Sequence, residues 1–73
     1  MKNQRTSVVM EMVFSLQEKG YFTESEITSE LGISRSTFFR SLSDLRCYLM
    51  ERKPWLEVDF DSSKGTYRYA KVL

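Results

Sequence analysis

Hydrophobic residues recur every three to four positions near the start of the chain, a spacing typical of an amphipathic helix. Val8, Met12 and Leu16 form this apolar stripe, and other hydrophobic residues flank it. Gly20 follows the stripe and can adopt the left-handed conformation that often ends a helix. We therefore expect a first helix over residues 6–19.

The start of a second, shorter helix is predicted from its capping residues. Thr23 and Glu26 have the spacing of a capping box, in which the Thr hydroxyl and the Glu carboxylate each accept a hydrogen bond from a backbone N–H. Apolar residues then recur with helical spacing, and Gly32 is placed to end the helix. The dipeptide Tyr21–Phe22, just before this helix, is expected to pair as a minor strand.

A third helix is expected after Ser34, which is a favourable N-cap residue. The helix should end near Arg52, because Pro54 disfavours helical geometry at the residue before it. Its core-facing residues are Phe38, Leu42, Leu45 and Leu49. The opposite face holds Ser36, Arg40, Ser43 and Cys47, with Thr37 and Phe39 on the flanks. This outward face is therefore small, polar and basic.

Beyond Pro54 the hydrophobic period changes from helical spacing to strict alternation, which predicts a strand with one dry face. The alternating apolar residues are Leu56, Val58 and Phe60, and the polar ones are Glu57, Asp59 and Asp61. Residues 62–65 have turn chemistry, because Gly65 tolerates a positive φ. Residues 66–72 resume as a second strand, with Tyr67 and Tyr69 facing inward and Arg68 exposed. The end of the chain is therefore expected to be a β-hairpin.

These elements predict an α+β domain in which three helices are followed by a β-hairpin. We expect the domain to cover residues 6–73, with residues 1–5 as a flexible N-terminal arm. A chain of 73 residues supplies one compact unit and no deep substrate cleft. It has no His and one Cys, so a zinc site, a disulfide and a His-activated nucleophile are not expected. We therefore expect neither an enzyme nor a cofactor.

The short apolar runs of this chain predict no membrane span, and a lone Cys suits a reducing, cytoplasmic compartment. The net charge is +1, from 11 Lys and Arg against 10 Asp and Glu, which argues against a general polyanion binder. The charges are unevenly distributed, however. The only charged residues in 20–33 are glutamates, whereas residues 34–46 contain three Arg and one Asp. Contact with phosphate on one face requires such a local excess of positive charge.

Two short helices joined by a tight turn with Gly32, the second of them capped by Ser34, are typical of a helix-turn-helix. In that motif the first helix supports the second, which offers its N-terminal side chains to the major groove of DNA. A corner within a helical bundle would give the same local pattern. The hairpin that follows the third helix favours the DNA-binding interpretation, because it completes the order of a winged helix-turn-helix.

The segment from Thr23 to Tyr69 resembles the N-terminal winged helix of DeoR-type and WYL-domain bacterial transcription regulators. The matching run is Gly32-Ile33-Ser34-Arg35-Ser36-Thr37-Phe38-Phe39-Arg40, and the wing motif matches Gly65-Thr66-Tyr67-Arg68. The chain departs from the pattern at Thr28, Ser36 and Ser41, where such regulators often carry Ala, a basic residue and an acid. The resemblance implies DNA contact by Ser34, Arg35, Ser36, Thr37, Phe39 and Arg40, and by the wing near Lys64. Ser43 is added to these candidate DNA contacts because it lies on the outward face of the third helix.

Each of these candidate contacts has a plain structural alternative. Arg40 could reach phosphate or a guanine edge, or it could pair with Asp44 one turn later. Arg35 opposes the helix dipole at the first helical position, which favours a nearby anion over simple exposure to solvent. Phe39 could contact a thymine methyl group or a sugar, or pack under the wing. Lys64 could contact phosphate or the minor groove, or be an ordinary turn residue.

Met10 and Phe14 project from the side of the first helix that faces away from its apolar stripe. One interpretation makes them a partner interface, for a second protomer or for a C-terminal effector domain. The alternative is that the hairpin covers them, through Trp55. We hold both interpretations open at this point.

The leading functional prediction is sequence-specific binding of double-stranded DNA in transcription regulation, in the cytoplasm and associated with the nucleoid. The third helix, at about residues 34–52, would enter the major groove, and residues 61–66 would form the wing. A homodimer is expected, because one such module buries little surface on DNA. The alternative is a winged-helix module that binds another protein and no DNA, which the near-neutral charge and the acidic first strand favour.

Overall fold

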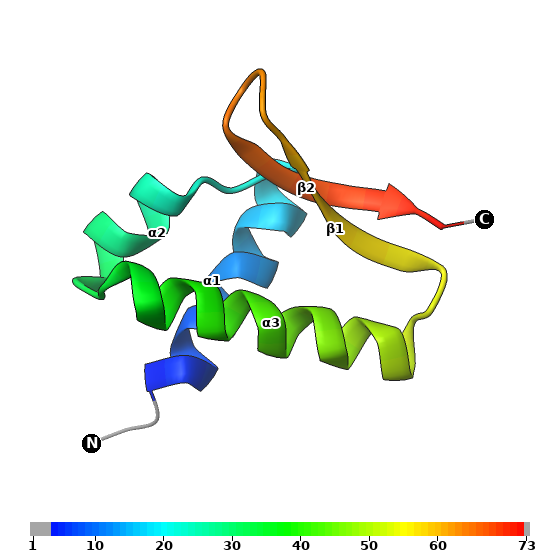
Figure 1. Ribbon diagram of the computed structural model, residues 1–73, viewed down its shortest axis with the longest axis horizontal. Helices are drawn as coiled ribbons and strands as arrows, with labels where there is room; N and C mark the ends of the chain where they lie inside the picture. Colours follow the sequence, from blue (N-terminus) through cyan, green and yellow to red (C-terminus); the bar gives the residue numbers. More distant parts are fainter. Residues whose placement is uncertain (1–3, 73) are drawn as a thin grey trace.

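The computed structural model describes residues 4–72 of the chain. Three helices precede two antiparallel strands, which gives the expected α+β arrangement (Figure 1). The elements are α1 (Gln4–Glu18), α2 (Glu24–Leu31), α3 (Arg35–Arg52), β1 (Leu56–Asp61) and β2 (Thr66–Lys71). The long α3 packs against α1, α2 and β1, so it is the element around which the others are arranged.

Helix α1 starts earlier than the sequence predicted. It begins at Gln4, whereas we expected residue 6, so Gln4 and Arg5 are helical and not part of a flexible arm. Gln and Arg are good helix formers, which explains the extension. The rest of the expected arm, residues 1–3, lies outside the described residues. The last turn closes as expected at Gly20, whose φ is 88° and whose N–H donates to the Ser15 carbonyl.

The predicted N-cap residues Thr23 and Ser34 are confirmed, but the second half of the predicted capping box is not, because the Glu26 carboxylate binds Lys19 and not the Thr23 N–H. Thr23 lies in an extended conformation, and its side chain accepts a hydrogen bond from the N–H of Glu26. The Glu26 carboxylate accepts from Lys19 Nζ at 2.9 Å, and so ties α2 to the end of α1. Gly32 ends α2 in the left-handed conformation at φ 64°, and Ser34 caps α3 through the N–H of Thr37. The tight turn between the two helices is therefore built from these local residues.

The hairpin pairs β1 with β2 in a single register, from Leu56 opposite Lys71 to Asp61 opposite Thr66. The predicted minor strand is confirmed as an isolated bridge between Phe22 and Tyr67. Phe22 donates to and accepts from the Tyr67 backbone, at 2.9 and 2.7 Å. This bridge lies on the side of β2 away from β1 and anchors the hairpin to the segment before α2.

The apolar face of β1 is more exposed to solvent than predicted. Val58 is buried and Leu56 is half-buried, but Phe60 is 51% exposed, so the expectation of a continuous buried face is wrong at Phe60. The turn end of the hairpin extends past the helices, and Phe60 is the next-to-last residue of β1 before this turn (Figure 1). On β2 the prediction is confirmed, because Tyr67 is buried, Tyr69 is half-buried and Arg68 is exposed.

The core joins all three helices to the hairpin. Phe22, Phe38 and Tyr67 form an aromatic cluster at its centre, with the Phe22 and Tyr67 rings stacked at a centroid distance of 5.2 Å. The other buried apolar residues are Val8, Met12, Leu16, Ile27, Leu42, Leu45, Leu49 and Val58. Full burial of one such side chain stabilises the fold by about 1.5–3 kcal/mol. Within residues 4–72, no helix combines the length and the apolar character needed to cross a membrane.

Candidate nucleic-acid interface

The outward face of α3 carries the residues that the sequence singled out. Ser34, Arg35, Ser36, Arg40 and Ser43 are exposed, and Thr37 is half-buried. Phe39 is 41% exposed, and its ring lies at 85° to the buried Phe38 ring, with a centroid distance of 5.0 Å. The expected separation of an apolar inner face from a small, polar outer face is therefore confirmed, while the role of that outer face stays a prediction.

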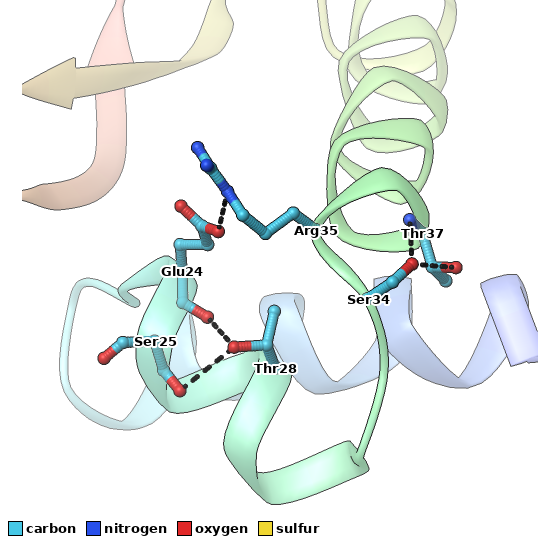
Figure 2. Close-up of polar contacts among 6 residues, drawn as sticks. All are labelled: Glu24, Ser25, Thr28, Ser34, Arg35 and Thr37. Atoms are coloured by element: carbon cyan, nitrogen blue, oxygen red, sulfur yellow. Dashed lines mark hydrogen bonds and ion pairs between the residues drawn. The ribbon is translucent and has the colours of Figure 1, made fainter.

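The hydroxyl groups at the start of α3 are held by the cap itself (Figure 2). Ser34 Oγ accepts from the Thr37 N–H and donates to Thr37 Oγ1, both at 3.2 Å. A hydroxyl group can donate and accept at once, so Thr37 can still donate to an acceptor outside the chain. The cap thus fixes the positions of two polar side chains at the N-terminal end of α3.

Arg35 has a partner that the sequence did not suggest. Its Nε donates to Glu24 Oε2 at 2.7 Å, and its guanidinium carbon lies 5.7 Å from the centre of the Phe39 ring (Figure 2). The Arg35 side chain remains 76% exposed, whereas that of Glu24 is 29% exposed. The nearby anion that the position of Arg35 favours is supplied in the structure by Glu24, while contact of Arg35 with phosphate stays a prediction. The ion pair uses Nε and leaves the two terminal nitrogens directed away from Glu24.

A hollow connects the start of α3 with the turn of the hairpin. Its lining comes from the start of α2, the start of α3, the end of β1 and the turn before β2. The lining residues are Thr23, Glu24, Ser25, Arg35, Phe39, Phe60, Lys64, Gly65 and Tyr67. Arg35 and Lys64, far apart in the sequence, therefore border one concave surface, together with the exposed Phe39 and Phe60 rings.

The turn that carries Lys64 is held by Asp61. The Asp61 carboxylate accepts from the Ser63 hydroxyl at 2.7 Å and from the Ser63 N–H at 3.1 Å. These hydrogen bonds, with smaller contributions from Lys64, lower the pKa of Asp61 below its ordinary value. The Asp61 carbonyl also accepts from the N–H groups of Lys64 and Gly65. Lys64 is therefore presented on an ordered turn, and Gly65 takes the positive φ of 67° that the turn requires.

The electrostatic character of this face is mixed. Arg35 and Lys64 bring positive charge to the hollow, and Glu24 opposes it there, while Asp61 lies beside Lys64 in the turn. The choice between phosphate contact and pairing with Asp44 stays open for Arg40. Arg46, the third Arg of the basic segment 34–46 after Arg35 and Arg40, instead donates from Nη2 to the Val58 carbonyl at 2.9 Å.

Sequence reasoning missed Glu24 and Phe60 as parts of this face. Glu24 follows the N-cap of α2, and only the crossing of α2 and α3 brings it to Arg35. Phe60 was assigned to the core from its alternation, which says nothing about how far the helices extend along the hairpin. Ser41 was also unrecognised as a core residue: it is 0% exposed, and its Oγ has no hydrogen-bond partner among the described residues.

Met10 and Phe14 lie on a different surface. They are 65% and 54% exposed, and no hairpin residue lines the groove around them. That groove is lined by Val9, Met10, Val13, Phe14, Gln17, Leu45 and Tyr48. The alternative in which the hairpin covers Met10 and Phe14 is therefore wrong, and Trp55 is itself half exposed beside Lys53.

Comparisons of the chain with protein-family models, with curated proteins and with solved structures find no match.

Proposed function

We propose that this chain is a winged helix-turn-helix that binds double-stranded DNA in a sequence-specific manner and acts in transcription regulation. In this proposal α3 enters the major groove with its N-terminal half, and the turn between β1 and β2 is the wing. The observation that supports the proposal is the hollow that Arg35 and Lys64 border together, with the hydroxyl residues Thr23 and Ser25 in its lining.

The side chains divide into two kinds of DNA contact. Arg35 and Lys64 border the hollow, so a sugar-phosphate backbone crossing it would meet one cation from each side. Ser36, Arg40 and Ser43 face outward from α3, where they would reach base edges. Phe39 offers a partly exposed ring for contact with a thymine methyl group or a sugar. Phosphate contacts would set the position of α3, and the outward residues would read the sequence.

A second protomer on the Met10 and Phe14 groove would complete the binding unit. A single small module buries little surface on DNA, and two-fold symmetric regulators obtain affinity by contacting two half-sites. The groove shares no lining residue with the hollow beside α3, so one chain can use both surfaces at once. A C-terminal effector domain is the other occupant that the sequence left open.

The direct test is binding to DNA of mixed sequence at low salt, followed by fluorescence anisotropy. We expect retention that weakens with salt, with a linear slope in a plot of log K against log salt concentration. Selection of bound duplexes from a random library should then enrich one sequence. Absence of binding at low salt would contradict the proposal.

A protein-interaction module is the second candidate. The net charge of +1 and the apolar Met10 and Phe14 groove favour it. The same low-salt titration separates the two candidates, because a module of this kind would not retain mixed-sequence DNA.

A further inference from the structure

Two exposed aromatic rings from different parts of the chain line one hollow. Phe39 belongs to α3 and Phe60 to β1, and both line the hollow that Arg35 and Lys64 border. Both side chains are exposed. Single exposed hydrophobic residues are common on protein surfaces, but two rings that line one concave site are typical of a ligand-binding surface.

Rings of the core support both of these side chains. Phe60 packs against Tyr67 at a centroid distance of 4.8 Å, and Tyr67 in turn stacks on Phe22. Phe39 packs against the buried Phe38. Side chains that are held in place before a ligand arrives lose little conformational entropy on binding. The two rings are therefore preformed parts of the hollow.

The charges around the two rings nearly cancel. Arg35 is paired with Glu24 at 2.7 Å. Asp61 lies beside Lys64 in the turn between β1 and β2. Because each cation has a carboxylate close by, general attraction of a polyanion is weak at this site. A ligand that binds here needs an interaction besides charge, and the exposed rings are placed to supply it.

The lining of the hollow suits a ligand with a flat apolar face, polar edges and a phosphate. The hollow has a volume of about 590 Å³, which lies within the roughly 300–1,000 Å³ of small-ligand sites. Thr23 and Ser25 add hydroxyl groups to the lining, and these can bind polar edges. A nucleobase with its phosphate has all of these features. In a duplex the neighbouring bases cover each face, so only an unpaired base can stack on a protein ring.

We propose that the hollow binds an unpaired nucleobase of a single nucleic-acid strand. The base would stack on the Phe60 ring, and the phosphates on either side of it would lie at Arg35 and Lys64. This inference goes beyond the proposed function, because its ligand is unpaired and Phe60 takes no part in the proposed duplex contacts. Arg35 and Lys64 would serve both ligands.

The first test compares two single strands of equal charge on the unmodified chain. Oligothymidine carries bases, and an abasic strand of the same length carries only the sugar-phosphate backbone. We expect oligothymidine to bind more tightly by about tenfold or more in anisotropy titrations at low salt, because base stacking on an aromatic side chain contributes at least a factor of this order. Equal affinities would mean that charge alone attracts the strand, and the proposal would be wrong.

Variants of the chain locate the stacking site. Phe60→Ala should weaken the binding of oligothymidine by about tenfold, whereas Phe60→Tyr keeps an aromatic ring and should retain it. Trp55→Ala removes a similarly exposed ring that does not line the hollow, so it should leave the affinity unchanged. Equal losses in Phe60→Ala and Trp55→Ala would contradict stacking in the hollow. Circular dichroism of each variant checks that it folds, and the comparison of the two strands needs no variant.

Duplex DNA of mixed sequence separates this proposal from the proposed function. Binding of the duplex without binding of oligothymidine would overturn the stacking proposal and leave the proposed function in place. Binding of oligothymidine without binding of the duplex would do the reverse. A matched pair of oligouridine and oligodeoxyuridine then distinguishes the source of the strand, because the tighter binder shows whether RNA or DNA fits the hollow better. Binding of neither would overturn the proposal.

Discussion

At the scale of single residues, Glu24 controls the availability of Arg35. The ion pair at 2.7 Å holds the guanidinium beside the hollow, but it also places a carboxylate where a phosphate would approach. The Arg35 side chain is largely exposed, so solvent screening keeps the pair weak. If the proposed function holds, Arg35 would therefore exchange Glu24 for a DNA phosphate at small cost.

Replacing Glu24 with Gln should raise the affinity for DNA. The substitution removes a negative charge from the hollow and frees Arg35, and we expect a gain of a few-fold, which is on the order of 1 kcal/mol. Anisotropy titrations with duplex DNA measure it. Glu30→Gln, an exposed site elsewhere on α2, is the matched control for net charge. An equal gain in both variants would mean that the position of Glu24 is unimportant.

Arg40→Ala tests whether this side chain contacts phosphate. We expect weaker binding and a salt dependence that is shallower by about one unit of log-log slope, because one fewer counterion is released. The exposed Arg52, at the far end of α3, provides a control substitution that should change neither quantity. An unchanged slope would remove Arg40 from the phosphate-contacting set.

Ser41→Ala should stabilise the fold. The buried Ser41 hydroxyl has no partner among the described residues, and an unpaired buried hydroxyl group costs about 1–3 kcal/mol. The exposed Ser43→Ala variant gains only the helix propensity of Ala, so it is the reference. Urea denaturation should show that Ser41→Ala raises the free energy of unfolding by about 1 kcal/mol more than Ser43→Ala. An equal effect of the two substitutions would mean that Ser41 is hydrogen-bonded in solution.

At the scale of elements, the turn between α2 and α3 fixes how the two helices cross. Gly32 supplies the left-handed residue and Ser34 the cap, so a few local positions set the start of α3 and the place of Arg35 beside Glu24. These signals are local, because the hydrogen bonds they satisfy lie within a few residues. That locality explains why the boundaries of α2 and the end of α3 could be predicted from the sequence.

Gly32→Ala should destabilise the chain by about 1 kcal/mol, because φ is 64° and an L residue is disfavoured there. A Cβ at Gly32 would have no atom within 4 Å, so the cost is conformational and not a clash. Gly32→Asn is the control, since Asn tolerates this conformation better. Thermal denaturation compares the two. Equal stability of Gly32→Ala and the unmodified chain would show that the turn relaxes to another conformation.

The β-hairpin shows the limit of local patterns. The alternation of apolar and polar residues correctly predicted the strands and the inward position of Tyr67, but it also placed Phe60 in the core. Burial depends on what packs over a face, and the helices end before the turn of the hairpin (Figure 1). The pattern therefore determined the side on which Phe60 lies and not whether that side is covered.

At the scale of the whole molecule, two candidate surfaces lie apart within the described residues. One is the hollow beside α3, and the other is the groove around Met10 and Phe14. They have no lining residue in common. The proposed contact with DNA and the proposed self-association would therefore use separate residues.

Phe14→Ser should prevent self-association. We expect the unmodified chain to form a dimer whose population rises with concentration in sedimentation experiments, and the variant to stay monomeric because it loses a half-exposed apolar ring. Phe60→Ser removes a similarly exposed ring from another surface and should leave the dimer unchanged. If the unmodified chain and Phe14→Ser are both monomeric, the hypothesis of self-association through this groove is wrong.

The sequence by itself determined the caps, the helical stripes, the alternating strands and the outward position of Ser36, Arg40 and Ser43. Each of these follows from backbone hydrogen bonding and side-chain periodicity over a few residues. Only the tertiary structure decided that Arg35 pairs with Glu24 and that Lys64 borders the same hollow. It also decided that Phe60 lies uncovered. These outcomes depend on how the helices and the hairpin cross and on where each element ends. The packing of the shared core sets how segments that are remote in the sequence lie relative to one another.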